Sequence, residues 1–290
     1  KETSNEKVVI VSNYTQTLDI IENLLHSRQM SLSRLDGSTP QKLRDSIVAT
    51  FNRSKSIFAF LLSSKSGGVG LNLVGASRLI LFDNDWNPSV DLQAMSRIHR
   101  QGQERPCYIY RLVTTGCIDE KILQRQLMKH SLSQKFLDSE KKKINYKDNL
   151  FSQEDLKDLF TILTDTKSNT HDLICSCEGE GTGFLNMKES LNITDHVVSK
   201  EGHCKQENKM KLIQWTSGLE VKKIMENLQS QEKNKQTKFI KECLVGYEHI
   251  NPTKTTKICD IVVARSVKKM SDTISFLFIK EGNRLGEDIS

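Results

Sequence analysis

The chain has 290 residues, of which 37% are hydrophobic and 27% charged, and its formal net charge is +6. It contains no run of 18 apolar residues and no signal-peptide pattern near its start, so we expect neither a membrane span nor a secretory leader. The length allows one large or two small domains, and the low hydrophobic content favours a folded part joined to a poorly packed part.

The basic excess is confined to the first half of the chain. Residues 1–136 hold 18 Lys and Arg against 12 Asp and Glu, whereas residues 137–290 hold 24 of each kind. This asymmetry indicates an anionic partner for the first half. The seven cysteines are odd in number and scattered, which disfavours a disulfide framework and indicates a reducing compartment.

The first half alternates between strand and helix patterns. Apolar runs predict strands at 7–11, 31–35, 57–62, 77–82 and 107–112. Apolar spacing predicts helices at 16–27 and 118–137. Start signals predict two more: one has Thr39 as its N-cap and Pro40 as its first residue and runs to residue 51, and the other begins at Pro88 and continues through Arg97 and Arg100. This order is typical of a parallel sheet with helices on both faces, an α/β fold.

Polar and glycine-rich segments follow the predicted strands. Since ligands of such sheets bind beyond the carboxyl ends of the strands, we expect these segments to meet at one edge. The segments are 12–13, 36–37, 63–70, 83–87 and the arginine-bearing helix.

Gln93, Arg97 and Arg100 are spaced by four and three residues, which on a helix places them on one face. Two arginines on one face form a clamp for a doubly charged anion, although an isolated pattern of this kind is usually a solvated basic face.

The glycine-rich segment 66–70 is neither a Walker A loop nor a dinucleotide fingerprint. It predicts either a phosphate-approaching turn into a short helix or a simple tight turn. Asp83 and Asp85 lack a third metal ligand nearby, which favours a role in ordering the loop or the arginine helix.

Six motifs occur in a fixed order, and together they carry a family resemblance: VVIVSNYTQTL, RLDGS, SSKSGGVGLNL, FDNDWNP, QAMSRIHRQGQ and YIYRL. Over residues 6–135 they resemble the second RecA-like lobe of the Snf-type DNA translocases of helicase superfamily two. SNYTQTLD and SSKSGGVGLNL are most similar to the recombination-repair branch, and within it to the B-type paralogues, whose members work with a strand-exchange recombinase.

The resemblance implies a role for each motif. It implies that Gln93, Arg97 and Arg100 reach the γ-phosphate of ATP as an arginine-finger set. It places Gly68, Gly70, Asn72 and Asp85 near the nucleotide. It also implies that the helix at 118–137 braces this lobe on the first one. Finally, the resemblance implies that a set of loop residues contacts the DNA backbone. These residues are Asn13, Gly37, Ser38, Thr39, Ser64, Lys65, Ser66 and Gly67.

The chain has no G-x-x-x-x-G-K-[ST] sequence and no strand-terminal Asp-Glu pair. In the resembled family these hold ATP and Mg²⁺ on the first lobe. We therefore expect the chain alone to carry half of an ATPase site and to hydrolyse ATP negligibly.

The second half has a charged linker, a short helix after Ser152 and a polar stretch at 164–240 that we expect to be partly disordered. Residues 258–263 and 273–279 read as strand-like or buried segments. The predicted domains are 1–137, a linker at 138–165 and a mostly helical or irregular region at 166–290.

Cysteine and histidine residues of the second half offer enough ligands for a tetrahedral Zn²⁺ site, although the spacing alone is also compatible with scattered reduced thiols. The resembled branch carries a zinc-binding segment after the second lobe, which favours a site. The predicted ligands are Cys175, Cys177, His203 and Cys204, with His171 as an alternative.

The favoured function is a lobe of a nuclear, ATP-driven double-stranded-DNA translocase in homologous recombination and repair, working with a recombinase and a first RecA-like lobe. One alternative is a motor-inactive scaffold that binds nucleic acid or a recombinase, but a scaffold does not need a γ-phosphate clamp. A second alternative is the lobe of a nucleosome remodeller.

Overall fold

The computed structural model describes residues 5–66, 70–138, 158–180, 237–238, 240–244, 247–254, 258–270 and 272–280. Within the long helix at 118–138, side chains are described only as far as Lys129. Residues 139–157 of the predicted linker at 138–165, most of the short helix predicted after Ser152, and most of the stretch 164–240 lie outside these ranges, so the predicted domain boundaries remain predictions.

The first half folds around a five-stranded sheet of order β2-β3-β1-β4-β5 in which every neighbouring pair is parallel. The fold class predicted from the sequence is therefore confirmed. β1 at the centre is buried along its whole length, as expected for a continuous β-branched run with a helical layer on each face. The strands are β1 Val8–Ser12, β2 Leu32–Leu35, β3 Ala59–Ser63, β4 Arg78–Leu81 and β5 Tyr108–Arg111.

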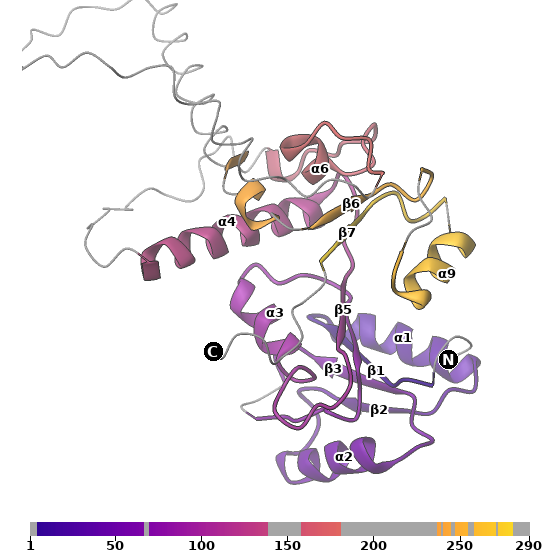
Figure 1. Cartoon of the computed structure of the whole chain (residues 1–290). Coiled ribbons are helices and arrows are strands. Elements are labelled where there is room, and N and C mark those ends of the chain that lie inside the picture. The colour runs from indigo at the N-terminus through magenta and orange to yellow at the C-terminus, as the bar shows by residue number, and fades with distance from the viewer. Residues whose placement is uncertain are drawn as a thin grey trace, which may run out of the picture.

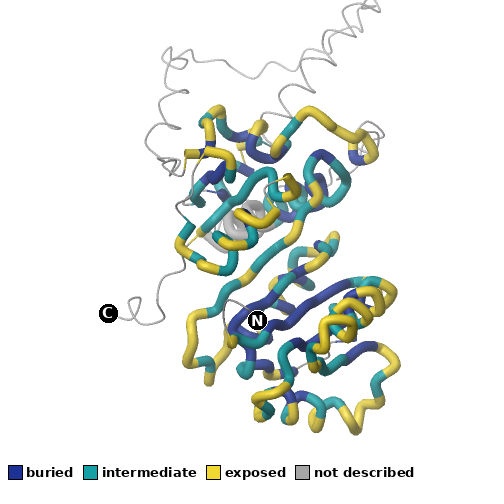
Figure 2. Tube along the Cα trace, turned by 90° about the vertical axis from the view of Figure 1, so that its right-hand side faces the viewer, coloured by how far each residue is buried: buried dark blue, intermediate teal, exposed yellow. Residues whose placement is uncertain are grey.

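Helices cover both faces of the sheet (Figure 1). α1 (Thr15–Ser27) turns Leu18 and Ile21 onto Val8 and Ile10 on one face. On the other face, α2 (Gln41–Arg53) and α3 (Pro88–Met95) enclose a larger core that contains Phe51, Phe60, Leu79 and Ile98. Figure 2 shows the strands as the buried centre between these exposed helices.

A buried polar network joins α3 to β5 and to α4 (Ile118–Asp138). The Asp91 carboxylate on α3 accepts from Arg111 Nη2 of β5 at 3.1 Å and from Gln126 Nε2 of α4 at 2.7 Å. Arg111 also donates to Asn84 Oδ1 at 2.9 Å, and the Asp85 backbone N–H donates to Asp91 at 3.2 Å. Asp91 and Gln126 are almost fully buried. Burial raises the pKa of the Asp91 carboxyl, although the Gln126 hydrogen bond and the Arg111 charge act against that rise.

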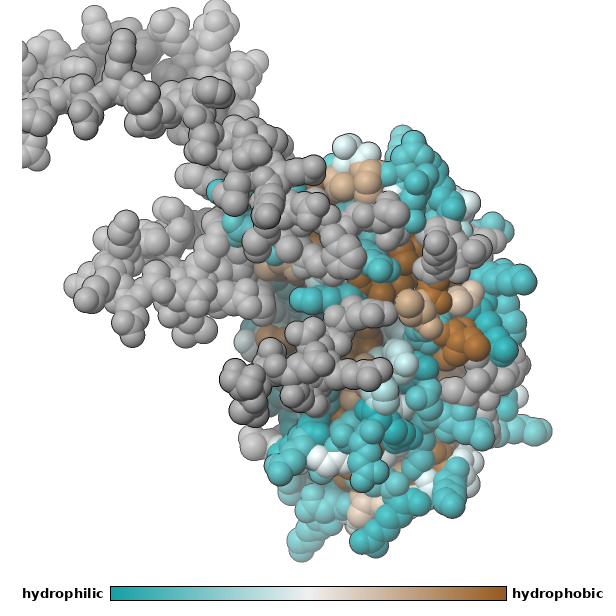
Figure 3. Space-filling model, viewed as in Figure 1, coloured by the Kyte–Doolittle hydropathy of each residue, from teal (hydrophilic) through white to brown (hydrophobic). Residues whose placement is uncertain are grey.

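The second half contributes α6 (Asn169–Ile174), α9 (Ile261–Lys269) and an antiparallel pair of β6 (Glu248–Ile250) with β7 (Leu277–Ile279). The Asp260 carboxylate caps α9 by accepting from Val262 N at 2.9 Å, and it also pairs with Arg78 of β4 at 3.0 Å. A residue 182 positions away is thereby tied to the sheet. Figure 3 shows hydrophobic residues gathered over the region of β7 and α9, whereas the surface over α2 is mainly hydrophilic.

Three local predictions were wrong. α2 begins at Gln41 with Pro40 as its N-cap, because the Thr39 hydroxyl accepts from the Asp36 N–H at 3.1 Å instead of capping the helix. α3 ends at Met95, so the helix does not extend to the arginines. The strand-like pattern at 258–263 enters a helix, because Asp260 supplies an N-cap that outweighs the β-branched residues after it.

The glycine-rich segment was expected to lead into a short helix. Residues 64–66 and 70–73, the described parts of that segment, contain no helix. Leu71 and Leu73 are buried while Asn72 is exposed, which is the alternation of extended backbone. Among the described residues, no helix is both long enough and apolar enough to cross a membrane.

We predict that Asp91→Ala lowers the free energy of unfolding by about 2–4 kcal/mol, because it leaves the buried Gln126 amide and the half-buried Arg111 guanidinium without the carboxylate that they share. Urea unfolding of the chain, followed by circular dichroism, measures this loss. The matched control is Asp19→Ala, which removes a carboxylate that is 56% exposed and lies 2.6 Å from Arg34. That change should cost less than about 1 kcal/mol, and equal losses in the two variants would contradict the network's importance.

Candidate functional site

The loops after β1, β3 and β4 are joined to one another at the carboxyl edge of the sheet. Ser64 N donates to the Ser12 carbonyl at 3.0 Å, and the Ser64 hydroxyl bonds the Asn13 side chain. The carboxylate of Asp83, two residues after the end of β4, accepts from Asn13 N at 2.7 Å and from the Ser12 hydroxyl. The predicted DNA-contact residues Asn13 and Ser64 are therefore brought together.

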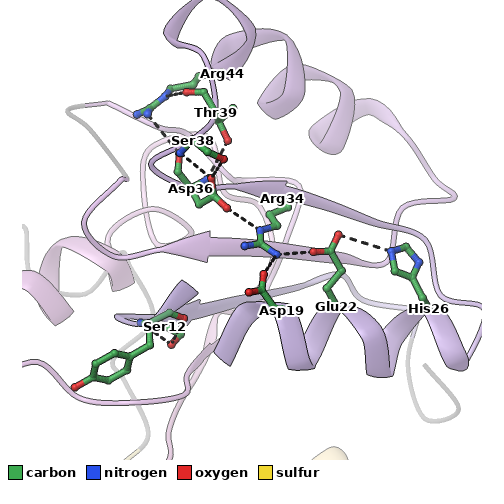
Figure 4. Close-up of polar contacts among 10 residues, drawn as sticks. Ser12, Asp19, Glu22, His26, Arg34, Asp36, Ser38, Thr39 and Arg44 are labelled. Atoms are coloured by element: carbon green, nitrogen blue, oxygen red, sulfur yellow. Dashed lines mark hydrogen bonds and ion pairs between the residues drawn. The ribbon is translucent and has the colours of Figure 1, made fainter. Parts of the chain in front are cut away.

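The loop after β2 is ordered by its own aspartate (Figure 4). Asp36 accepts from Ser38 N at 2.9 Å and Ser38 Oγ at 2.6 Å, and Arg34 holds its other oxygen at 2.8 Å. The Ser38 hydrogen bond, followed by the Arg34 contacts, lowers the pKa of the Asp36 carboxyl despite its burial. Gly37 and Ser38 stay exposed and Thr39 is half-buried, so the tip of this loop can face a ligand.

The glycine-rich segment leaves β3 at the same edge. Lys65 is exposed there and Ser66 is buried, whereas Gly67 and Gly68 lie outside the described residues. Gly70 has φ of 107°, a backbone conformation that L side chains rarely adopt, and it is exposed. The segment next meets the turn after α3, because Leu73 N donates to the Arg97 carbonyl at 3.0 Å. Asn72 is exposed beside that contact.

The predicted clamp residues occupy a tight turn that continues from α3. Gln93, in the last turn of the helix, is exposed, Arg97 is buried and Arg100 is exposed. Arg100 Nη1 donates to the Gly70 carbonyl at 3.3 Å, which links the turn to the glycine-rich segment. Burial lowers the pKa of the Arg97 guanidinium, and the neighbouring Arg100 charge adds to this effect. Two cations therefore lie close together, an arrangement that an anion between them would stabilise.

Asp85, predicted to lie near the nucleotide, orders the start of α3. Its carboxylate accepts from Asn87 N at 2.8 Å, and its carbonyl accepts from the Gln126 side chain of α4. Asn87 in turn caps α3 by accepting from Ser89 N at 3.1 Å. Asp85 thus connects α4 to the start of α3, the helix that leads into the arginine turn.

A separate Cys/His cluster lies in the second half of the chain. His171, on α6, and Cys175 and Cys177, just after it, meet His249 of β6. His171 Nε2 lies 3.2 Å and His249 Nδ1 3.6 Å from the Cys177 sulfur, and one ligand atom from each of the four residues falls within 4.8 Å of the others. His203 and Cys204, predicted as ligands with Cys175 and Cys177, lie outside the described residues.

The cluster fits a structural Zn²⁺ ion. Two thiolates and two imidazoles are a common tetrahedral donor set, in which neighbouring ligand atoms are roughly 3.4–3.8 Å apart. His249 is fully buried, and its Nδ1 faces the Cys177 sulfur. Burial, followed by the nearby His171, lowers the pKa of His249 to about 4, so the imidazole is neutral, as a metal ligand must be. A bound ion would fasten α6 to β6 across 72 residues of sequence.

Sequence reasoning did not find His249, and no local signal could have found it. It stands alone in a Tyr-Glu-His-Ile segment, with no second Cys or His at metal-ligand spacing. Its part in the cluster depends on the pairing of β6 with β7, which is decided by contacts distant in the chain.

Comparisons with known proteins agree with the family resemblance that the motifs indicate. Residues 1–102 match the family model described as "Helicase conserved C-terminal domain". The chain is 59% identical over 281 residues to the "DNA repair and recombination protein RDH54" of Saccharomyces cerevisiae (strain ATCC 204508 / S288c), an alignment that covers 96% of this chain and 28% of that protein. It is 48% identical over 202 residues to a "DNA repair and recombination protein RAD54-like" of Drosophila erecta, covering 69% of this chain and 25% of the fly protein.

Among solved structures, the C-terminal part of the Fun30 ATPase domain matches with 38% sequence identity and a TM-score of 0.42, over 53% of this chain and 46% of that one. By the alignments with the yeast and fly relatives, the chain spans less than a third of the length of either protein.

We predict that the purified chain binds about one zinc ion and that removing the ion with a chelator lowers its melting temperature, since metal-binding energy contributes to folding energy. His249→Ala should abolish the bound zinc, as measured by elemental analysis. The control Cys259→Ser changes an exposed cysteine outside the cluster and should keep it. A double His203→Ala, Cys204→Ala variant separates the two possible ligand sets, and loss of zinc in it alone would contradict the cluster.

Proposed function

This chain belongs to the Snf-type family of RDH54 and RAD54-like DNA repair and recombination proteins and contains their helicase C-terminal lobe, and from that premise we propose that it is the second motor lobe of an ATP-dependent double-stranded-DNA translocase. The observation that carries the proposal is the Arg100 hydrogen bond to Gly70, which brings the arginine turn against the glycine-rich segment at the carboxyl edge of the sheet.

Arg97 and Arg100, with Gln93, act as the arginine-finger set. ATP and Mg²⁺ are held mainly by a first RecA-like lobe that carries the Walker motifs, and this lobe adds positive charge where negative charge develops during phosphoryl transfer. The buried Arg97 and exposed Arg100 supply two cations near one point. Gly70, Asn72 and the Asp85 loop form the nucleotide side of the same edge, and Gly68, which lies outside the described residues, is assigned to the nucleotide by the family resemblance alone.

The loops after β1, β2 and β3 contact one DNA strand. They present exposed or half-buried hydroxyl, amide and backbone N–H groups at Asn13, Gly37, Ser38 and Ser64, with the exposed cation of Lys65 beside them. Such groups suit contact with phosphates and carry no sequence information, as a translocase requires. Thr39 and Ser66 belong to the same loops, and Gly67, outside the described residues, is assigned to the DNA by the family resemblance alone.

The remaining assignments rest on the family. We propose that the protein works in the nucleus in homologous recombination with a strand-exchange recombinase, and that the Cys/His cluster holds a structural zinc. A motor-inactive scaffold would not need the paired arginines. A nucleosome-remodelling lobe would share the same motor and differ only in its partners.

In the complete motor, Arg100→Ala should lower kcat for DNA-stimulated ATP hydrolysis by roughly 10³-fold or more while leaving ATP binding intact. Steady-state turnover and nucleotide titration measure the two quantities. Arg28→Ala is the matched control, because it removes an exposed charge at the C-terminal end of α1. Unchanged turnover in Arg100→Ala would remove this residue from the site.

The 290-residue chain by itself should hydrolyse ATP negligibly in the presence of DNA, because its sequence contains no Walker A motif. A phosphate-release assay with and without double-stranded DNA tests this. A robust, DNA-dependent rate that persists through repurification would contradict the half-site proposal.

A further inference from the structure

Arg44, on the first turns of α2, lies between two of the proposed DNA-contact loops. Its Nε donates to the Thr39 carbonyl at 3.1 Å, its Nη1 to the Ser66 carbonyl at 2.7 Å, and its Nη2 to the Asp36 carbonyl at 3.5 Å. Figure 4 shows the guanidinium directed at the loop that holds Asp36, Ser38 and Thr39. One side chain thus bonds the backbones of the loops after β2 and β3.

These contacts direct one N–H of each guanidinium nitrogen at the protein backbone. Each of its three nitrogens donates to a backbone carbonyl, and the residue is half-buried. A phosphate ligand would instead present its fork outward to accept two anionic oxygens. The planar guanidinium can reach both loops at once, whereas the single ammonium of lysine cannot span them in the same geometry.

Each of the two loops is also held by hydrogen bonds that do not involve Arg44. Asp36 accepts from Ser38 and from Arg34, and the loop after β3 is bonded to the loop after β1 through Ser64. The two units touch closely, since a Cβ built on Gly37 would lie 3.6 Å from Ser66 Oγ. Arg44 bonds both units, so the spacing between them depends on it.

We propose that Arg44 is a positioning residue that sets the spacing of the two loops, so that their N–H and hydroxyl groups reach phosphates of the same DNA strand together. This inference rests on the proposed DNA contact of those loops. It assigns a function to a basic side chain that does not itself touch DNA.

The test uses the complete motor and a fluorescent double-stranded oligonucleotide, with the dissociation constant measured at several salt concentrations. Arg44→Ala should weaken binding on the order of tenfold at each salt concentration, equivalent to losing about one hydrogen bond to a charged phosphate. The slope of log Kd against log salt should stay unchanged, because no phosphate-bound cation is lost. The KM for DNA in the ATPase assay should rise, with the DNA-free rate unaltered.

Two variants match the charge change. Lys42→Ala removes an exposed cation from the same helix and should leave binding unchanged. Lys65→Ala removes a proposed phosphate contact and should reduce the slope by about 0.9.

Arg44→Lys keeps the charge but not the fork and should behave like Arg44→Ala. If Arg44→Ala does not fold, judged by its melting temperature, Arg44→Lys and Arg44→Gln carry the test.

The outcomes are distinguishable. If Arg44→Ala lowers the slope by about 0.9, Arg44 is itself a phosphate ligand and the positioning role is wrong. If Arg44→Ala or its substitutes bind normally while Lys65→Ala does not, the positioning role fails and the DNA-contact proposal stands. If Lys65→Ala and Ser38→Ala also bind normally, the proposed DNA contact of these loops is wrong.

Discussion

The ion pair of the buried Asp91 with the half-buried Arg111 is the interaction on which the placement of the arginine turn depends. A carboxylate removed from water is stable only when it is fully hydrogen-bonded; here Gln126 adds a bond to Asp91, and Asn84 accepts from Arg111. Because these residues come from α3, β5, α4 and the loop before α3, the pair fixes four parts of the lobe relative to one another. The proposed arginine-finger role would require such rigidity, since small misplacements reduce catalysis strongly.

The carboxyl edge of the sheet contains most of the residues proposed to carry function, and short polar contacts join its loops. Asp83 accepts from the loop after β1, Ser64 bonds that same loop from β3, and Arg100 reaches the glycine-rich segment. Proposed DNA contacts and proposed nucleotide contacts therefore belong to one hydrogen-bonded set of loops.

Much of the lobe could be predicted from residue patterns. The five apolar runs and the parallel order follow from strand and helix periods repeated along the chain, and the observed strands agree with them to within one or two residues. The helix that was expected to carry Arg97 ends at Met95, because Arg97 N and Ile98 N bond carbonyls three residues back in a tighter turn. That ending also depends on Leu73 binding the Arg97 carbonyl, a contact that no local pattern contains.

The sequence by itself determined the fold class, the edge at which the loops converge and the family. These depend on local period, on the order of elements and on motifs whose residues are adjacent. Tertiary structure alone decided that His249 joins Cys175 and Cys177, that Asp260 reaches Arg78 and that Arg44 binds two loops. The physical reason is the same in each case: these contacts join residues far apart in the chain, and their geometry exists only after the sheet and its covering helices have packed.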